Sequence, residues 1–256
     1  MNASSLGAAL GAEWLKLRTL RSTWWTLAAA CVLTVGIGVL YGSIIKGDYE
    51  TFGADEDFDP VGMGFAGSSI GQLAMVCFGV LAVSGEYATG TIRASLAAVP
   101  HRGVFWAAKA VAVAAAAFAV ALPTAFATFA GAQTAMGARQ NAGIGDPGAL
   151  RATIGLAVYL TLLCLLSAGV AAMLRGTALS LGILVPLFFI VSDVLGNLPG
   201  VESVAQYLPN LAGMQITRAV ADDRISVGAW GGLAVLVAWT GAALAGGLLV
   251  LRRRDA

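Results

Sequence analysis

Six stretches of this sequence are apolar over a length that can cross a lipid bilayer, and they constrain the fold more than any motif does. The first, residues 22–45, carries no charge and opens with Trp24 and Trp25, whose indole rings favour the lipid interface. A hydrocarbon core about 30 Å thick needs roughly 20 helical residues. We therefore predict an all-α membrane protein with one transmembrane domain, residues 1–256, and spans at residues 22–45, 60–85, 110–138, 152–174, 177–192 and 228–251.

The composition supports this class of protein. Hydrophobic side chains make up 58% of the 256 residues and charged side chains only 11%, whereas soluble domains carry roughly 25% charged residues. The mean hydropathy is +0.82. A polytopic membrane protein is the class that fits these values.

The distribution of charge predicts the orientation. Six crossings place both termini on one side, and that side holds ten of the fifteen Lys and Arg residues but three of the fourteen Asp and Glu residues, a net charge of +7. The other side holds five cations and eleven acids, a net charge of −6. Because cytoplasmic loops carry an excess of Lys and Arg, we expect both termini in the cytoplasm.

Residues 5–21 place apolar side chains at spacings of three and four, namely Leu6, Leu10, Trp14, Leu17 and Leu20. This stripe leaves out most of the charges, which are Glu13, Lys16, Arg18 and Arg21. The pattern predicts an amphipathic helix lying along the membrane surface. A straight extension of the first span into water is the alternative.

Two external regions follow from the predicted topology. Asp55, Asp57 and Asp59 imitate the first ligand positions of a calcium loop, but Pro60 replaces the required Gly, so we interpret the segment as a solvated loop. Residues 193–227 mix charges, prolines and short apolar patches. We expect short external helices there, either lying in or on the outer leaflet or forming a partial re-entrant hairpin.

The fifth span is short and contains Pro186, so a broken helix supported by its neighbours is expected. Asp193 lies near its outer end. Ionisable groups near membrane depth are functional candidates, which makes Asp193 a possible residue of an external substrate path. A position among the lipid headgroups is the other interpretation.

The connector at residues 86–109 is the most polar stretch between two spans on the side of the termini. It contains Gly85-Glu86-Tyr87, then Gly90-Thr91-Ile92-Arg93 and Leu96, then Pro100-His101-Arg102 and Lys109. These residues resemble the signature that follows the second span in ABC-2 type permeases, the membrane subunits of ABC exporters. The likeness extends over nearly the whole chain, through the N-terminal interfacial helix, the six spans and the short external helices. His101 departs from the pattern, since a small polar residue is more usual there.

This resemblance implies a function. In that family the connector carries a coupling helix that fits a groove on the ATPase. The chain would then be a multi-pass permease of the bacterial inner membrane that exports a hydrophobic or amphipathic substrate. Its expected partners are two copies of a cytosolic ABC ATPase, which bind ATP and Mg²⁺, a second permease subunit, identical or homologous, and membrane lipids. The coupling residues carried over are Glu86, Tyr87, Gly90, Thr91, Arg93, Pro100, His101 and Arg102.

Simpler interpretations of these residues stay open. Glu86 and Arg93 also fit a solvated surface pair, and Gly90 a bend that needs a small residue. His101 fits an ordinary surface position. Arg102 and Lys109 fit anchors to anionic lipid.

No motif in the sequence indicates an enzyme. It lacks a G-x-x-x-x-G-K-[ST] phosphate loop, and its single His and three Cys form no metal or nucleophile pattern. We expect no cofactor or metal in this chain and no nucleic-acid partner, because the cations are dispersed along membrane edges. A secondary, ion-coupled transporter and a non-transporting scaffold or sensor are the alternative functions.

Overall fold

The computed structural model describes residues 3–47, 58–99, 101–196, 198, 201–220 and 226–253, and the regular secondary structure in these ranges is helical. Six helical segments in them are long and apolar enough to cross a membrane, which confirms the predicted number of spans. They are α2 (Arg21–Gly47), α5 (Ser68–Thr89), α7 (Arg102–Met136), α8 (Ala149–Leu174), the broken segment Thr177–Gly196 and α13 (Ala229–Arg253).

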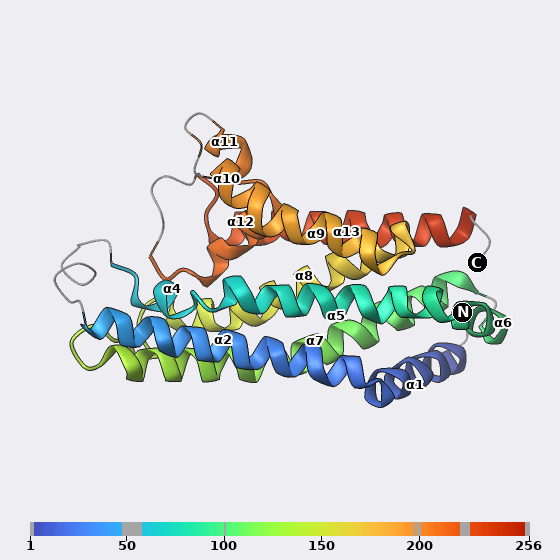
Figure 1. Ribbon diagram of the computed structural model, residues 1–256, viewed down its shortest axis with the longest axis horizontal. Coiled ribbons are helices and arrows are strands. Elements are labelled where there is room, and N and C mark those ends of the chain that lie inside the picture. The colour runs from blue at the N-terminus through green and yellow to red at the C-terminus, as the bar shows by residue number, and fades with distance from the viewer. Residues whose placement is uncertain are drawn as a thin grey trace.

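The helices form an elongated bundle with two different ends (Figure 1). One end, which we call the terminal end, carries α1 (Ala3–Thr19), α6 (Thr91–Ala98) and the C-terminal end of α13 (Figure 1). The other carries α4 (Pro60–Gly64) and α12 (Pro209–Met214) (Figure 1). Both chain ends therefore lie on one side, as six crossings require.

The core of the bundle is organised around α8. Its most apolar 18-residue window is 72% buried, compared with 61% for α5 and 22–33% for the other four spans. Within this core the Tyr159 hydroxyl of α8 donates a hydrogen bond of 2.5 Å to Gln72 Oε1 of α5. In lipid such a pair satisfies two polar groups that have no water available. The peripheral helices α2 and α13 then pack around α8, α5 and α7.

The connector between the second and third spans is shorter than the predicted 86–109. Helix α5 continues to Thr89 and α7 begins at Arg102, so Glu86 and Lys109 lie inside helices. The second span also begins later than residue 60, because α4 is a separate short helix and α5 starts at Ser68. The helix limits therefore differ from the predicted span limits, because Glu86 and Lys109 continue inside helices and a turn at residues 65–67 separates α4 from α5.

The fifth span is broken where Pro186 predicts. Helix α9 (Thr177–Pro186) passes into a π-helical turn, η1 (Leu187–Val191), and then into α10 (Ser192–Gly196). The π-helical turn shifts the backbone pairing, since Ser192 N donates to the Leu187 carbonyl five residues back, so the Phe188 carbonyl accepts from other donors. Asn210 of α12 supplies one, since its amide donates to the Phe188 carbonyl at 3.1 Å. The neighbouring segment thus supports the break.

The segment before α13 enters the bundle and does not simply lie on its surface. After α11 (Glu202–Ala205), helix α12 and the 3₁₀ turn η2 (Gln215–Thr217) pack between α8 and α13. A Cβ added at Gly213 would lie 2.7 Å from both Tyr159 and Leu236. Tyr159 lies about 15 Å along α8 from its first residue at 1.5 Å per residue. This depth favours the re-entrant interpretation for α12 and η2.

Asp59 has a structural role at this end. Its Oδ1 accepts from the backbone N–H groups of Val61 and Gly62 at 3.1 and 2.9 Å, which caps α4. Its Oδ2 accepts from Ala219 N at 2.9 Å and so ties α4 to the segment after η2. Asp55 and Asp57, the other two residues of the calcium-like pattern, lie outside the described residues.

Close packing between α2 and α5 gives a testable prediction. A Cβ at Gly67 would overlap the backbone carbonyl of Thr34 and lie 2.8 Å from Gly38 N, and backbone atoms cannot rotate away. We expect Gly67→Ala to lower the free energy of unfolding by about 2 kcal/mol, the usual cost of overpacking. Thermal unfolding in detergent measures this. Gly36→Ala, whose Cβ would meet nothing within 4 Å, is the control; equal midpoints for the two variants would contradict the prediction.

Candidate functional site

A sharp turn places α6 across the terminal end of the bundle. Gly90 has a φ of +70°, a left-handed conformation that side chains rarely adopt, and it joins α5 directly to α6. A Cβ at Gly90 would meet nothing within 4 Å, so backbone conformation and not crowding requires the glycine. The chain therefore leaves the membrane span and turns within one residue.

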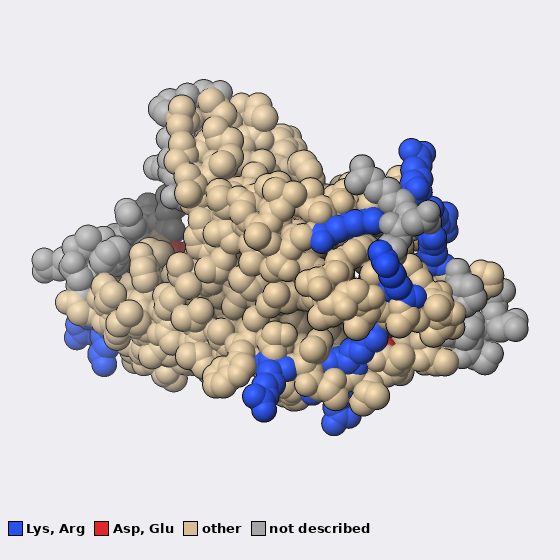
Figure 2. All heavy atoms as spheres, turned by 45° about the vertical axis from the view of Figure 1, so that its right-hand side comes forward, with Lys and Arg blue, Asp and Glu red and all other residues tan. Residues whose placement is uncertain are grey.

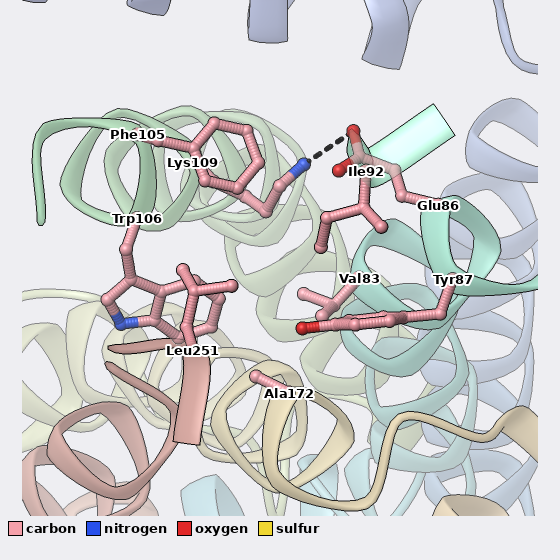
Figure 3. Close-up of a pocket in the computed structure, with 9 residues that line it drawn as sticks. All are labelled: Val83, Glu86, Tyr87, Ile92, Phe105, Trp106, Lys109, Ala172 and Leu251. Carbon is pink, nitrogen blue, oxygen red and sulfur yellow. Dashed lines mark hydrogen bonds and ion pairs between the residues drawn. The ribbon is translucent and has the colours of Figure 1, made fainter. Parts of the chain in front are cut away.

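Four charged side chains meet beneath this turn, and we call Glu13, Lys16, Glu86 and Lys109 the charge cluster. The Lys109 ammonium lies 2.5 Å from Glu13 Oε2 and 2.9 Å from Glu86 Oε1. The Lys16 ammonium lies 2.6 Å from Glu13 Oε1 and 2.8 Å from Glu86 Oε1. Each lysine therefore bridges both glutamates, and the cluster joins α1, α5 and α7. Figure 3 shows the Lys109–Glu86 contact.

The cluster is largely removed from solvent. The side chains of Lys109, Glu13 and Glu86 are 5%, 6% and 11% exposed, whereas that of Lys16 is 36% exposed. The ring of Phe105 lies close to both ammonium groups. Its centroid is 5.3 Å from Lys109 Nζ and 5.8 Å from Lys16 Nζ. Charges buried in this way are tolerated because they are paired and net neutral.

Lys16 also reaches α6. Its ammonium donates to Ser95 Oγ at 3.0 Å. The buried residue of α6, Ile92, is 4% exposed and points towards Val83 of α5. Helix α6 is thus attached to the bundle through the turn at Gly90, the Ser95–Lys16 hydrogen bond and the Ile92 contact.

The surroundings of Lys16 set its ionisation. Partial burial lowers the pKa of this lysine, but hydrogen bonds and charges from Glu13 and Glu86 outweigh burial and raise the pKa above its ordinary value of 10.5. A raised pKa in the folded state stabilises the fold below pH 10.5, and this contribution is lost as the pH rises through the folded-state pKa. Lys16 therefore carries its positive charge at physiological pH.

A small pocket adjoins the cluster between α5, α7, α8 and α13. Its cavity volume is about 10 Å³, and its walls include Tyr87, Trp106 and Leu251 (Figure 3). Drug-sized ligands occupy pockets of roughly 300 Å³ or more. Glu86 also lines this pocket, and its Oε2 has no hydrogen-bond partner among the described residues. The pocket is therefore too small to hold a ligand of that size.

Two arginines fix the ends of neighbouring helices. Arg102, the first residue of α7, donates to the Leu251 carbonyl at 2.5 Å and so binds the last turn of α13. Arg175, after α8, donates to the Val250 carbonyl at 3.4 Å, and its guanidinium lies 5.4 Å from the ring centroid of Tyr87. Cations near a helix C-terminus satisfy carbonyls that have no partner within the helix.

The structure brings together only part of the predicted site. Glu86 is buried and bonded to two lysines, which does not fit the alternative of a solvated surface pair. Arg93 and His101 are exposed on the terminal end. The Thr91 hydroxyl lies 2.9 Å from that of Thr89.

Two predicted site residues are not fully described. Pro100 lies outside the described residues, and Asp193 is described only as part of the α10 backbone. Nothing in the structure therefore tests the substrate-path hypothesis for Asp193.

Sequence reasoning missed the role of Glu13, Lys16 and Ser95. The predicted apolar stripe of α1 includes Trp14 and Leu20, yet these are 41% and 47% exposed. From residue 6 onward, the buried positions of α1 are Ala9, Glu13 and Leu17, which recur at intervals of four residues. The available sequence signal was a carboxylate in the middle of that series, together with a lysine, Lys109, in a later helix.

The charge cluster gives a second prediction. Lys109→Met keeps the length of the side chain but leaves Glu13 Oε2 and Glu86 without this ammonium, and we expect a loss of about 3–5 kcal/mol of unfolding free energy. Adding Glu13→Gln removes an uncompensated charge, so the double variant should be more stable than Lys109→Met alone. Chemical unfolding in detergent measures both. Lys46→Met, an exposed lysine at the other end of α2, is the control; additive effects at positions 13 and 109 would refute the coupling.

No model of a known protein family matches this chain, and a search of curated proteins finds no match either.

Proposed function

We propose that the chain is the permease subunit of an ATP-driven ABC exporter and that α6 is the segment on which the ATPase acts. The observation that carries the proposal is the attachment of α6. A short helix, exposed on one side at the terminal end, is joined within one residue to α5 and through Ser95 to the charge cluster. A displacement of α6 is therefore transmitted to three helices.

The exposed surface of α6 suits close contact with a protein partner. Its exposed residues are Arg93 and four small ones, namely Thr91, Ala94, Ala97 and Ala98. Small side chains let another surface approach the helix backbone, and one cation adds a charge that the partner can complement. This surface and the ABC-2 resemblance of residues 85–109 support the same function.

ATP hydrolysis in this proposal belongs to a separate cytosolic ATPase, present in two copies, with Mg²⁺ bound there. A second permease subunit, identical or homologous, completes the transporter in the bacterial inner membrane, and the exported substrate is hydrophobic or amphipathic. The position of the charge cluster favours this over an ion-coupled carrier. Glu86 lies three residues before the end of α5, whereas carriers place ionisable groups near the midplane.

The test is co-expression with a soluble ABC-type ATPase encoded by a neighbouring reading frame. We expect Arg93→Glu to lower co-purification and permease-dependent ATP turnover at least tenfold, because a reversed charge at an interface costs several kcal/mol. Lys46→Glu makes the same charge change at the opposite end and should leave both readouts intact. Equal behaviour of the two variants would overturn the assignment of α6, and uphill transport by the chain alone on an ion gradient would overturn the exporter.

The proposed orientation has its own test in cells. In a variant whose native cysteines are replaced, Ala94→Cys on α6 should react with a membrane-impermeant maleimide only after the membrane is opened. Ile144→Cys, in the exposed loop between α7 and α8, should react in intact cells. The reverse pattern would place the termini outside.

A further inference from the structure

The corner between α1 and α2, residues 14–25, combines cations with exposed indole rings. Helix α1 ends at Thr19 and α2 begins at Arg21, so Arg18 and Arg21 flank the corner, and both are exposed. Trp24 and Trp25 are 62% and 76% exposed directly beside them. Indole rings favour the depth of the lipid headgroups, which places the two guanidinium groups at that depth.

The corner is held in a defined shape. The Trp24 Nε1–H donates to the Arg18 carbonyl at 3.0 Å, across the break between the two helices. This bond fixes the angle at which α1 leaves α2 and keeps the Trp24 ring beside Arg18. The cations and indoles are therefore presented together and not as independent side chains.

No carboxylate of α1 competes for these cations. Its acid, Glu13, is 5% exposed, and both of its oxygens are bonded to lysines of the charge cluster. Glu86 at the end of α5 is also buried, at 8% exposed, and its Oε1 is bonded to both lysines. Figure 2 shows the result: Lys and Arg side chains gather towards the terminal end, and little Asp or Glu surface is visible there.

The corner differs from the other exposed cations of the terminal end. Arg252 and Arg253, on the last turn of α13, are also exposed, but the tryptophans of α13, Trp230 and Trp239, lie earlier in that helix. Among the described residues, cations flanked by exposed tryptophans occur at the terminal end only in the α1–α2 corner. Exposed positive charge occurs both in the α1–α2 corner and on the last turn of α13. Only the corner also has exposed indole rings beside that charge.

We propose that the α1–α2 corner binds the headgroups of anionic phospholipids through Arg18 and Arg21, with Trp24 and Trp25 seated beside the bound lipid. The guanidinium groups supply planar donors that match phosphate oxygens, and the indoles set the depth at which the phosphate is met. This site does not depend on the proposed transport function. It would hold α1 against the membrane while the buried face of α1 is held by the charge cluster.

Native mass spectrometry tests the site by measuring which lipid the full chain retains. The chain is released from detergent that contains added phosphatidylglycerol or phosphatidylcholine. The unaltered chain should retain phosphatidylglycerol in preference to phosphatidylcholine. The double variant Arg18→Gln/Arg21→Gln should bind phosphatidylglycerol about 25-fold more weakly, since each cation near an anionic surface contributes about fivefold in affinity. Arg18→Lys/Arg21→Lys keeps the charge but not the planar donors, so it should lose less affinity than the Gln variant but more than the unaltered chain.

The matched control is Arg252→Gln/Arg253→Gln, which removes two exposed cations from the same end. We expect this variant to keep its preference for phosphatidylglycerol. An equal loss in both double variants would mean a diffuse charge effect and would overturn the site, as would an unchanged preference in Arg18→Gln/Arg21→Gln. Displacement of the lipid by excess inorganic phosphate alone would show a phosphate site in place of a lipid site and would also overturn the proposal.

Discussion

The buried pairing of two glutamates with two lysines is the interaction on which the terminal end of this structure depends. Replacing a buried ion pair by apolar side chains is often neutral or stabilising, so the charge cluster is weak evidence for extra stability. Its effect is better described as specificity. Glu13, Glu86 and Lys109 satisfy one another only when α1, α5 and α7 are in one register and rotation, and any other arrangement leaves a charge unpaired.

At the opposite end of the bundle, hydrogen bonds between side chains and backbone groups fix how the segments pack. There, backbone groups of loops and short helices are bound by side chains of the spans and their neighbours. Asp59 accepts from Val61, Gly62 and Ala219, and the Gln133 amide donates to the Pro60 carbonyl at 2.8 Å. Irregular backbone at membrane depth is tolerated where it is buried in protein, and these side chains provide that condition for α4 and for the segment after η2.

The number of spans could be predicted from the sequence because apolar length is a local property. The helix ends could not, because Glu86 and Lys109 neutralise each other across 23 residues and so let α5 and α7 continue past charged positions. The buried face of α1 was missed for the same reason: Glu13 counts as solvated until Lys109 is known to lie opposite. The sequence shows a glycine at position 90 but does not show that its φ is left-handed, because that conformation depends on how α6 folds back.

The way α6 is attached limits how it can move. Its start is fixed to α5 by a single residue, Gly90, and its middle is bonded to Lys16, which itself binds Glu13 and Glu86. Separating α6 from the bundle would break its hydrogen bond to the Lys16 ammonium, which costs about 1.5–3 kcal/mol, and would also expose Ile92. A force applied to α6 therefore meets less resistance if α1, α6 and the terminal ends of α5 and α7 move together as one body. The break at Pro186 and η1 lies in the fifth span, outside that body, so rigid displacement at the terminal end does not require the charge cluster to open.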